Sequence, residues 1–165
     1  MDWDAIGAVG EIVGATAVVL SLFYVGLQVR HSAKAVRGQT YESLSASAID
    51  VTMQLTADLD LSLAMRSAML GEEVQPDQDP RVLTTIHCYT RIAATAHYQH
   101  ELGLLDGEQL KNLTATNAVQ LSSPIGKRYW NSTKQLFSRS FVSYIEQEMS
   151  GPSLYASEAT RVHDQ

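Results

Sequence analysis

Histidine, cysteine and glutamate side chains gather between residues 87 and 101, in the sequence HCYTRIAATAHYQHE. His97 and His100 are three residues apart, and His97 and Glu101 are four apart, so on a helix all three could face the same way. Imidazole and carboxylate groups are suitable ligands for zinc or iron. The spacing therefore allows a metal site on this one helix.

A metal site inside a helical bundle usually takes its ligands from several helices, and here one helix alone offers them. His100 also continues an apolar stripe that runs from Val82 to Ala96, which is the pattern of a histidine at the edge of a core. This second interpretation gives the three residues a structural role. We expect no bound metal or cofactor, and the metal site stays the alternative.

Cys88 is the single cysteine, so the chain contains no internal disulfide and no site made of several cysteines, which fits a reducing compartment. His87 precedes it, but successive helical residues point about 100° apart, and we expect a buried structural thiol. The sequence has no glycine-rich phosphate loop, no Gly-x-Ser-x-Gly motif and no His-Glu-x-x-His motif. We therefore expect a protein that is not an enzyme.

Residues 12–29, IVGATAVVLSLFYVGLQV, contain no charged side chain. As a helix they would span about 27 Å, close to the roughly 30 Å of a bilayer core. Trp3 and Tyr24 are of the type found at membrane interfaces. Asp2 and Asp4 precede the stretch without any Lys or Arg, unlike the start of a signal peptide. We expect a membrane-spanning helix, with a signal peptide or a buried soluble helix as the alternatives.

Basic residues follow this stretch at once, at Arg30, Lys34 and Arg37. The positive-inside rule then predicts an inner-membrane protein with its N-terminus outside and its C-terminal domain in the cytoplasm. An anionic lipid leaflet suits this cluster. The formal net charge of −6 argues against a nucleic-acid partner, because such binding needs clustered Lys and Arg.

Small residues recur along one side of the same stretch, at Gly7, Gly10, Gly14 and Ala17. In lipid, such a face lets two helices approach closely, although glycine and alanine are also common in membrane helices generally. Glu11 lies beside this face. A carboxylate inside the bilayer is unfavourable unless it is paired or neutral, so Glu11 lies either at the headgroups or in a helix–helix contact.

The remaining chain shows helical periodicity and no sustained two-residue alternation. Gly38 allows a bend, and 71–80 reads as an acidic loop. Capping residues and first-turn prolines indicate helix starts near Asp58, Pro80, Asp106, Ser123 and Ser138. The predicted fold is all-α, with a single N-terminal transmembrane helix and its flanks (1–37), a small antiparallel helical bundle (38–150) and a flexible tail (151–165).

A small basic and aromatic patch, Lys127-Arg128-Tyr129-Trp130, allows two interpretations. It could lie on a membrane surface or bind a partner. The simpler interpretation places the aromatic rings in the bundle and leaves the two charges in solvent. We expect the second arrangement.

Two stretches carry a pattern that goes beyond periodicity. The first, GAVGEIVGATAVVLSLFYVGLQVRHSAKAVR (7–37), has a Gly-Glu-Ile-Val-Gly-Ala core and an Arg-containing exit. The second, SSPIGKRYWNSTKQLFSRSFVSYIEQEM (122–149), has a proline turn, an aromatic pair and two later phenylalanines. With GLLDGEQL (103–110), they resemble an uncharacterised family of small bacterial proteins with one N-terminal membrane helix. The resemblance implies a membrane-anchored helical protein and supplies no catalytic residues.

These observations together predict an accessory or assembly subunit of a membrane protein complex, whose partners are membrane lipid and other membrane helices. Two alternatives remain. One is a membrane-tethered bundle that binds a metal or another ligand, and the other is a self-associating anchor held by its glycine face.

Overall fold

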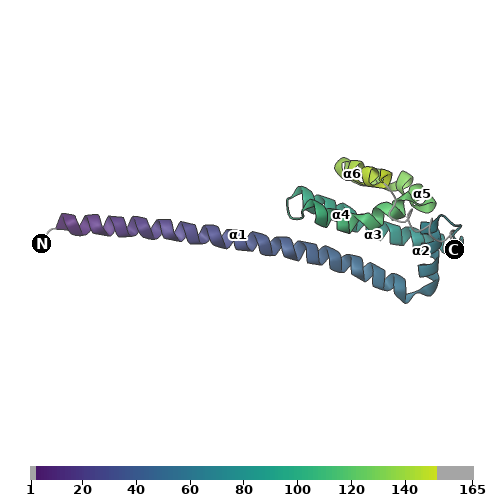
Figure 1. Cartoon of the computed structure of the whole chain (residues 1–165), viewed down its shortest axis with the longest axis horizontal. Helices are drawn as coiled ribbons and strands as arrows, with labels where there is room; N and C mark the ends of the chain where they lie inside the picture. The colour runs from purple at the N-terminus through teal and green to yellow at the C-terminus, as the bar shows by residue number, and fades with distance from the viewer. Residues whose placement is uncertain (1–2, 152–165) are drawn as a thin grey trace, which may run out of the picture. The chain divides into compact units, whose positions relative to one another are not determined.

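The computed structural model describes residues 3–151, and for residues 3–10, 12, 13 and 15 it describes only the helical backbone. Within this part the chain consists of helices joined by short connections (Figure 1). They are α1 (Trp3–Ala57), α2 (Leu59–Leu70), α3 (Asp79–Glu101), α4 (Gly107–Ser122), α5 (Pro124–Thr133), the short 3-10 helix η1 (Lys134–Leu136) and α6 (Arg139–Ser150). The all-α class expected from the sequence is confirmed, since residues 3–151 contain no strand.

The chain divides into two compact units, Met1–Gln39 and Thr40–Gln165. The first unit holds the N-terminal part of α1. The second holds the rest of α1 and the five other α-helices, so the packed core described below belongs to it.

Local chemistry sets the starts of four helices. The side-chain oxygens of Asp58, Asp106, Ser123 and Ser138 each accept a hydrogen bond from the backbone N–H three residues further on, as the sequence predicts. Asp106 forms a full capping box, because the side chain of the residue three positions on returns a bond to its backbone N–H. Gly103, with φ of 72°, takes the left-handed conformation that follows the end of α3.

Gly38, where the sequence allows a bend, lies inside α1, which continues through it as helix. Glycine in a helix interior costs about 1 kcal/mol relative to alanine. That penalty weakens a helix locally without ending it. Good helix formers on both sides, among them Ala35, Arg37 and Gln39, help the helix to continue.

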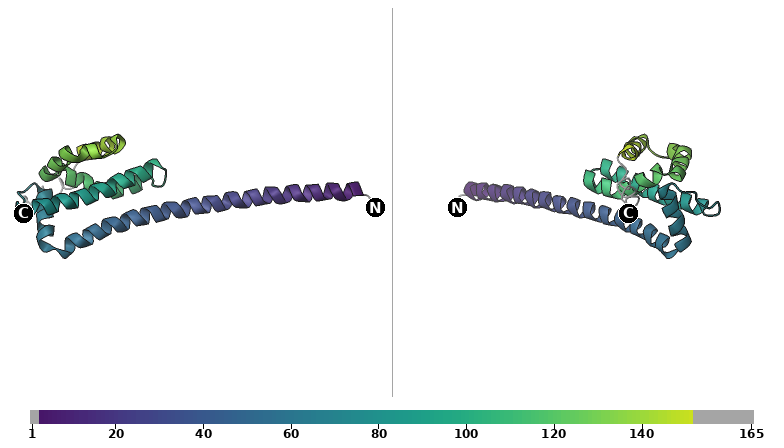
Figure 2. Two further views of the ribbon diagram at one scale, coloured as in Figure 1. Left: turned by 180° about the vertical axis from the view of Figure 1, so that it is seen from behind. Right: turned by 45° about the vertical axis from the view of Figure 1, so that its right-hand side comes forward.

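Helix α3 is the centre of the second unit. It packs most extensively against α4 and also contacts α2, α5 and α6 (Figures 1 and 2). The main core consists of apolar side chains from these helices, including Val82, Ile86, Ala93, Leu121, Trp130, Phe141 and Ile145. The second unit's part of α1 adds Leu44 to a smaller cluster with Ala96, Leu105 and Leu110.

Helix α5 approaches α4 unusually closely at Gly126. A Cβ atom on this glycine would lie 1.9 Å from the carbonyl oxygen of Gln120. The same helix buries Tyr129 and Trp130 and leaves Lys127 and Arg128 exposed. The simpler interpretation of the basic and aromatic patch is therefore confirmed.

Candidate functional site

His97 points from α3 toward α6. Its side chain is buried, and its ring centroid lies 5.8 Å from that of Phe141 and 5.1 Å from that of Tyr144. Its nearest carboxylate oxygen, Oε2 of Glu101, is 3.9 Å from Nδ1. Burial lowers the pKa of His97, and the nearby Glu101 only partly opposes this shift. The imidazole ring of His97 therefore packs between α3 and α6 as an aromatic core side chain.

His100 points elsewhere, and its Nδ1–H donates a hydrogen bond of 2.9 Å to the backbone oxygen of Leu105. Glu101 is exposed. The structure therefore does not bring His97, His100 and Glu101 together at one point. Among the described residues, no group of three or more His, Cys, Asp or Glu side chains is placed to hold a metal ion.

Cys88 is half-buried, so the buried structural thiol expected from the sequence is only partly buried. The reason is tertiary, because this side of α3 faces a gap and not a tightly packed helix. His87 pairs with a different group, since its Nδ1 lies 2.9 Å from the hydroxyl of Tyr129 on α5. The structure thus gives this imidazole a packing role.

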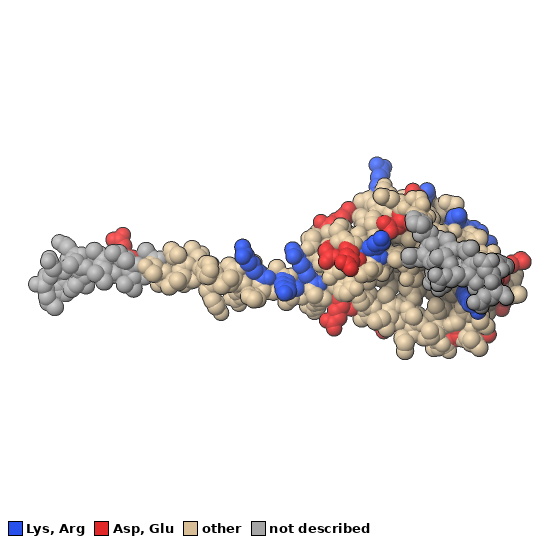
Figure 3. Space-filling view, viewed as in Figure 1, with Lys and Arg blue, Asp and Glu red and all other residues tan. Residues whose placement is uncertain are grey.

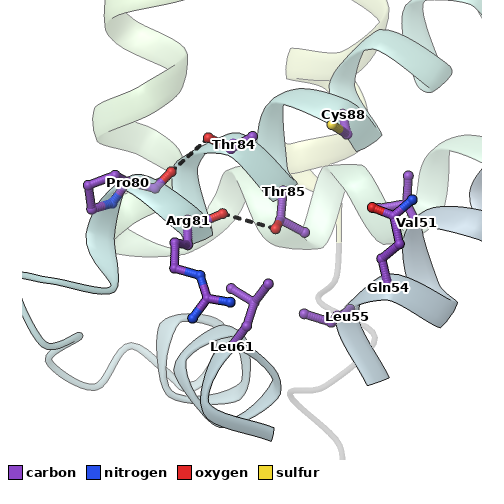
Figure 4. A pocket seen from close by; sticks show the side chains of 9 residues that line it. All are labelled: Val51, Gln54, Leu55, Leu61, Pro80, Arg81, Thr84, Thr85 and Cys88. Carbon is purple, nitrogen blue, oxygen red and sulfur yellow. Dashed lines mark hydrogen bonds between the residues drawn. The ribbon is translucent and has the colours of Figure 1, made fainter. Parts of the chain in front are cut away.

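The gap beside Cys88 is an open cavity of about 360 Å³ between the end of α1, α2 and α3 (Figure 4). Its lining consists mainly of apolar groups, with a few polar ones: Val51, Gln54, Leu55, Leu61, Pro80, Arg81, Thr84, Thr85 and Cys88. The hydroxyls of Thr84 and Thr85 bond to their own helix backbone. The one charged group, Arg81, is paired with Asp58. The cavity therefore presents a mostly neutral surface.

Nothing in the sequence indicates this cavity. Its walls come from three helices, and each residue in them has the type expected of an ordinary amphipathic face. Two hydrogen bonds between helices, one buried and one partly buried, lack a sequence signal for a similar reason. Asn117 donates its side-chain N–H to the hydroxyl of Thr90 at 2.9 Å, and the hydroxyls of Thr114 and Tyr144 lie 2.9 Å apart. The only advance sign was polar residues at core positions.

The first unit presents a different kind of surface. All described side chains of residues 16–29 are exposed. Nine of them are large and apolar, with exposed fractions from 42% to 68%: Val18, Val19, Leu20, Leu22, Phe23, Tyr24, Val25, Leu27 and Val29. Since consecutive helical residues point in successive directions about 100° apart, this surface surrounds the helix. In Figure 3 it forms the uncharged tan part of α1.

The residues of the predicted small face fall partly outside the described side chains. Gly7 and Gly10 are among the residues of which only the helical backbone is described, whereas Glu11, Gly14 and Ala17 are exposed. A Cβ atom on Gly14 would meet nothing within 4 Å. In the described part of the chain, Glu11, Gly14 and Ala17 are therefore accessible to a partner molecule.

The predicted interface residues are also on the helix surface. Tyr24, Arg30, Lys34 and Arg37 are exposed, and the side chain of Trp3 lies outside the described residues. Within the part of the chain that is described, no helix has the length and apolar character needed to cross a membrane. The transmembrane helix expected from the sequence thus receives no support from that finding.

Comparison with known proteins adds no family to this picture. No protein-family model matches the chain, and neither does any curated protein or solved structure.

Proposed function

We propose that the protein is a non-enzymatic, single-pass membrane protein that serves as an accessory or assembly subunit of a membrane complex. In this proposal the N-terminal part of α1 crosses the inner membrane with its N-terminus outside. The second unit lies in the cytoplasm. The small face of α1 packs on another membrane helix.

The observation that carries the proposal is the apolar surface of α1 over residues 16–29. A helix that is apolar on all sides is stable only inside a protein core or inside a membrane. Here the large apolar side chains of residues 16–29 are exposed, and none of these residues is buried by the described part of the chain. Lipid acyl chains are a partner of the required chemistry for Leu22, Phe23 and their neighbours.

The length of the segment also bears on the proposal. The described side chains from 16 to 29 cover only about 21 Å as helix. The uncharged sequence begins at Ile12 and includes Val13 and Ala15, whose side chains lie outside the described residues. With these, the segment reaches about 27 Å, which a bilayer can accommodate by modest local thinning.

The first experiment asks whether the full-length protein is integral to the membrane. Carbonate at high pH releases peripheral proteins and leaves spanning proteins in the pellet. We expect the protein in the pellet, and a reporter fused to its C-terminus should be active only in the cytoplasm. Release by carbonate would overturn the membrane anchor, and a periplasm-active C-terminal reporter would overturn the orientation.

The second experiment tests packing through the small face. Gly14→Leu fills the face, and Gly26→Leu is its matched control, because Gly26 lies about 120° away around the helix. Apart from the neighbouring backbone of α1, a Cβ atom at either position meets no described atom within 4 Å. After purification in mild detergent, we expect Gly14→Leu to remove a larger complex and Gly26→Leu to keep it. Equal recovery of the complex with both variants would contradict the proposal.

The same purification distinguishes the self-associating anchor. If the species lost with Gly14→Leu is a homodimer, the partner helix is a second copy of this chain. GxxxG-type contacts such as Gly10 to Gly14 support dimers of this kind in lipid.

A ligand-binding bundle is a second candidate, favoured by the cavity beside Cys88. Its volume of about 360 Å³ and mainly apolar lining fit a small neutral apolar molecule. Cys88 is the only thiol of the chain, so its reaction rate with a maleimide reports on this cavity alone. We expect naphthalene to slow the reaction, and Val51→Phe, which fills the cavity, to remove that effect. An unchanged rate with naphthalene would exclude this apolar probe as a ligand.

A further inference from the structure

Arg30, Lys34 and Arg37 lie on one face of α1. Helical residues at these spacings of four and three fall within about 60° of each other around the helix axis, and about 10 Å separates the first from the last along it. All three side chains are exposed. We call these three residues the basic stripe.

The basic stripe has no carboxylate partner among the described residues. The ion pairs among the described residues involve other basic groups, namely Arg81, Arg128, Lys134 and His97. The sequence from 12 to 41 contains no Asp or Glu at all. No carboxylate within residues 12–41 therefore compensates this positive charge.

The position of the stripe indicates its partner. It begins at the residue that follows the uncharged stretch 12–29, and Figure 3 shows Lys and Arg side chains gathered where the tan part of α1 ends. If that stretch lies in a bilayer, the stripe lies at the level of the lipid phosphates. Arg and Lys side chains are long enough to reach phosphate oxygens and bind them by charge-assisted hydrogen bonds.

We propose that the basic stripe is a binding site for anionic phospholipid headgroups, selective over zwitterionic ones. The inference rests on the proposed membrane anchor. It goes beyond the role of these basic residues in setting the orientation of the protein in the membrane. Orientation depends on the number of basic residues near the end of a membrane helix. Binding to one or two lipid phosphates also requires the cations to converge from the same side of the helix.

This difference allows a sharp control. Ser32 is exposed and points about 200° away from Arg30 around the helix. The double variant Ser32→Lys, Lys34→Ala keeps the number of cations near the membrane and removes the central cation of the stripe. The single variant Lys34→Ala lowers the count as well. A role in orientation alone predicts that the double variant behaves as the wild type.

The test uses full-length protein in membranes containing equal amounts of phosphatidylglycerol and phosphatidylcholine, followed by gentle detergent release and native mass spectrometry of bound lipid. We expect the wild type to retain phosphatidylglycerol preferentially. Both variants should lose that preference by roughly fivefold, which corresponds to one cation at an anionic surface. Wild-type retention in the double variant, or equal retention of the two lipids by the wild type, would overturn the site.

Carbonate extraction of the same membranes separates the two proposals. A protein that stays in the membrane without selecting phosphatidylglycerol keeps the anchor and loses the lipid site. A protein released by carbonate that still carries phosphatidylglycerol in a stripe-dependent way keeps the lipid site and loses the anchor. In that case the stripe binds the membrane surface from outside.

Discussion

Gly126 on α5 lies so close to Gln120 on α4 that a Cβ atom at this position would be 1.9 Å from the Gln120 carbonyl oxygen and 2.8 Å from the Cα of Leu121. Both contacts are to backbone, which cannot turn aside as a flexible side chain would. The absence of a side chain at Gly126 therefore permits the packing that buries Trp130 in the core.

Gly126→Ala should force α4 and α5 apart and lower the free energy of unfolding by about 1–3 kcal/mol, the usual range for overpacking. Gly107→Ala is the matched control, because a Cβ atom there meets nothing within 4 Å. Thermal unfolding of the full-length protein, followed by far-UV circular dichroism, measures both. Equal melting temperatures for the two variants would show that the close approach of Gly126 to α4 does not contribute to stability.

The hydrogen bond from Asn117 to Thr90 joins α4 to α3 inside the core, and the Oδ1 atom of Asn117 has no partner among the described residues. Thr90→Val removes the remaining partner of a buried amide and should cost about 1–3 kcal/mol of unfolding free energy. The double variant Thr90→Val, Asn117→Leu removes both polar groups, so we expect it to be more stable than Thr90→Val alone.

Chemical denaturation of the wild type, both single variants and the double variant gives the coupling energy between these two residues. A coupling energy near zero would mean that the bond between them contributes nothing to stability. Phe141 on α6 takes no part in this hydrogen bond. Phe141→Leu is therefore an unrelated core variant with which the additivity of unfolding free energies can be tested.

The sequence predicts those features whose cause lies within a few residues. Asp58, Asp106, Ser123 and Ser138 begin helices because each side chain reaches a backbone N–H three residues ahead, and such spacing is visible in the sequence. The close approach of Gly126 to α4 has no comparable local signature, since a glycine near a helix start is common for other reasons.

The candidate sites could also be predicted only where their cause is local in the sequence. Helical spacing allowed His97, His100 and Glu101 to face one way, but α6 and the Leu105 carbonyl, both beyond the helix, determine where the two histidines point. The half-exposure of Cys88 likewise depends on how α1, α2 and α3 meet. For the basic stripe, by contrast, residue spacing on α1 alone defines the face.

Asp58 combines a helix cap with an ion pair. Its carboxylate accepts the backbone N–H of Leu61 at 3.0 Å and pairs with Arg81. These interactions lower the pKa of Asp58, the hydrogen bond from Leu61 most strongly. Asp58→Asn keeps a capping oxygen and loses the charge, whereas Asp58→Ala loses both. We therefore expect the melting temperature at pH 7 to fall in the order wild type, Asp58→Asn, Asp58→Ala.

A group whose pKa is lowered on folding stabilises the protein above its unfolded pKa and loses this contribution as the pH falls through its folded pKa. For Asp58 the loss begins below the ordinary value of 3.8. The difference in melting temperature between wild type and Asp58→Asn should thus narrow below that pH. A difference that persists unchanged at pH 2.5 would assign the effect to shape instead of charge.

His97 should make the second unit less stable in mild acid. Burial against Phe141 and Tyr144 lowers its pKa below the ordinary value of 6.5, while Glu101 raises it and His100 lowers it further. The unfolded chain therefore binds the proton more readily than the folded one. Stability from neutral His97 is complete above pH 6.5 and decreases as the pH falls from 6.5 toward the folded pKa.

The measurement is the melting temperature of the full-length protein between pH 7.5 and pH 5. His97→Leu keeps an apolar side chain at the α3–α6 contact and removes the titrating group, so its melting temperature should vary less with pH than that of the wild type. His31→Gln is the control, because it removes an exposed histidine of the first unit and leaves His97 in place. Parallel pH profiles for wild type and His97→Leu would show that another group causes the acid sensitivity. A steeper profile for His97→Leu would mean that the protonated imidazole stabilises α3 through Glu101, which lies four residues further on in the same helix.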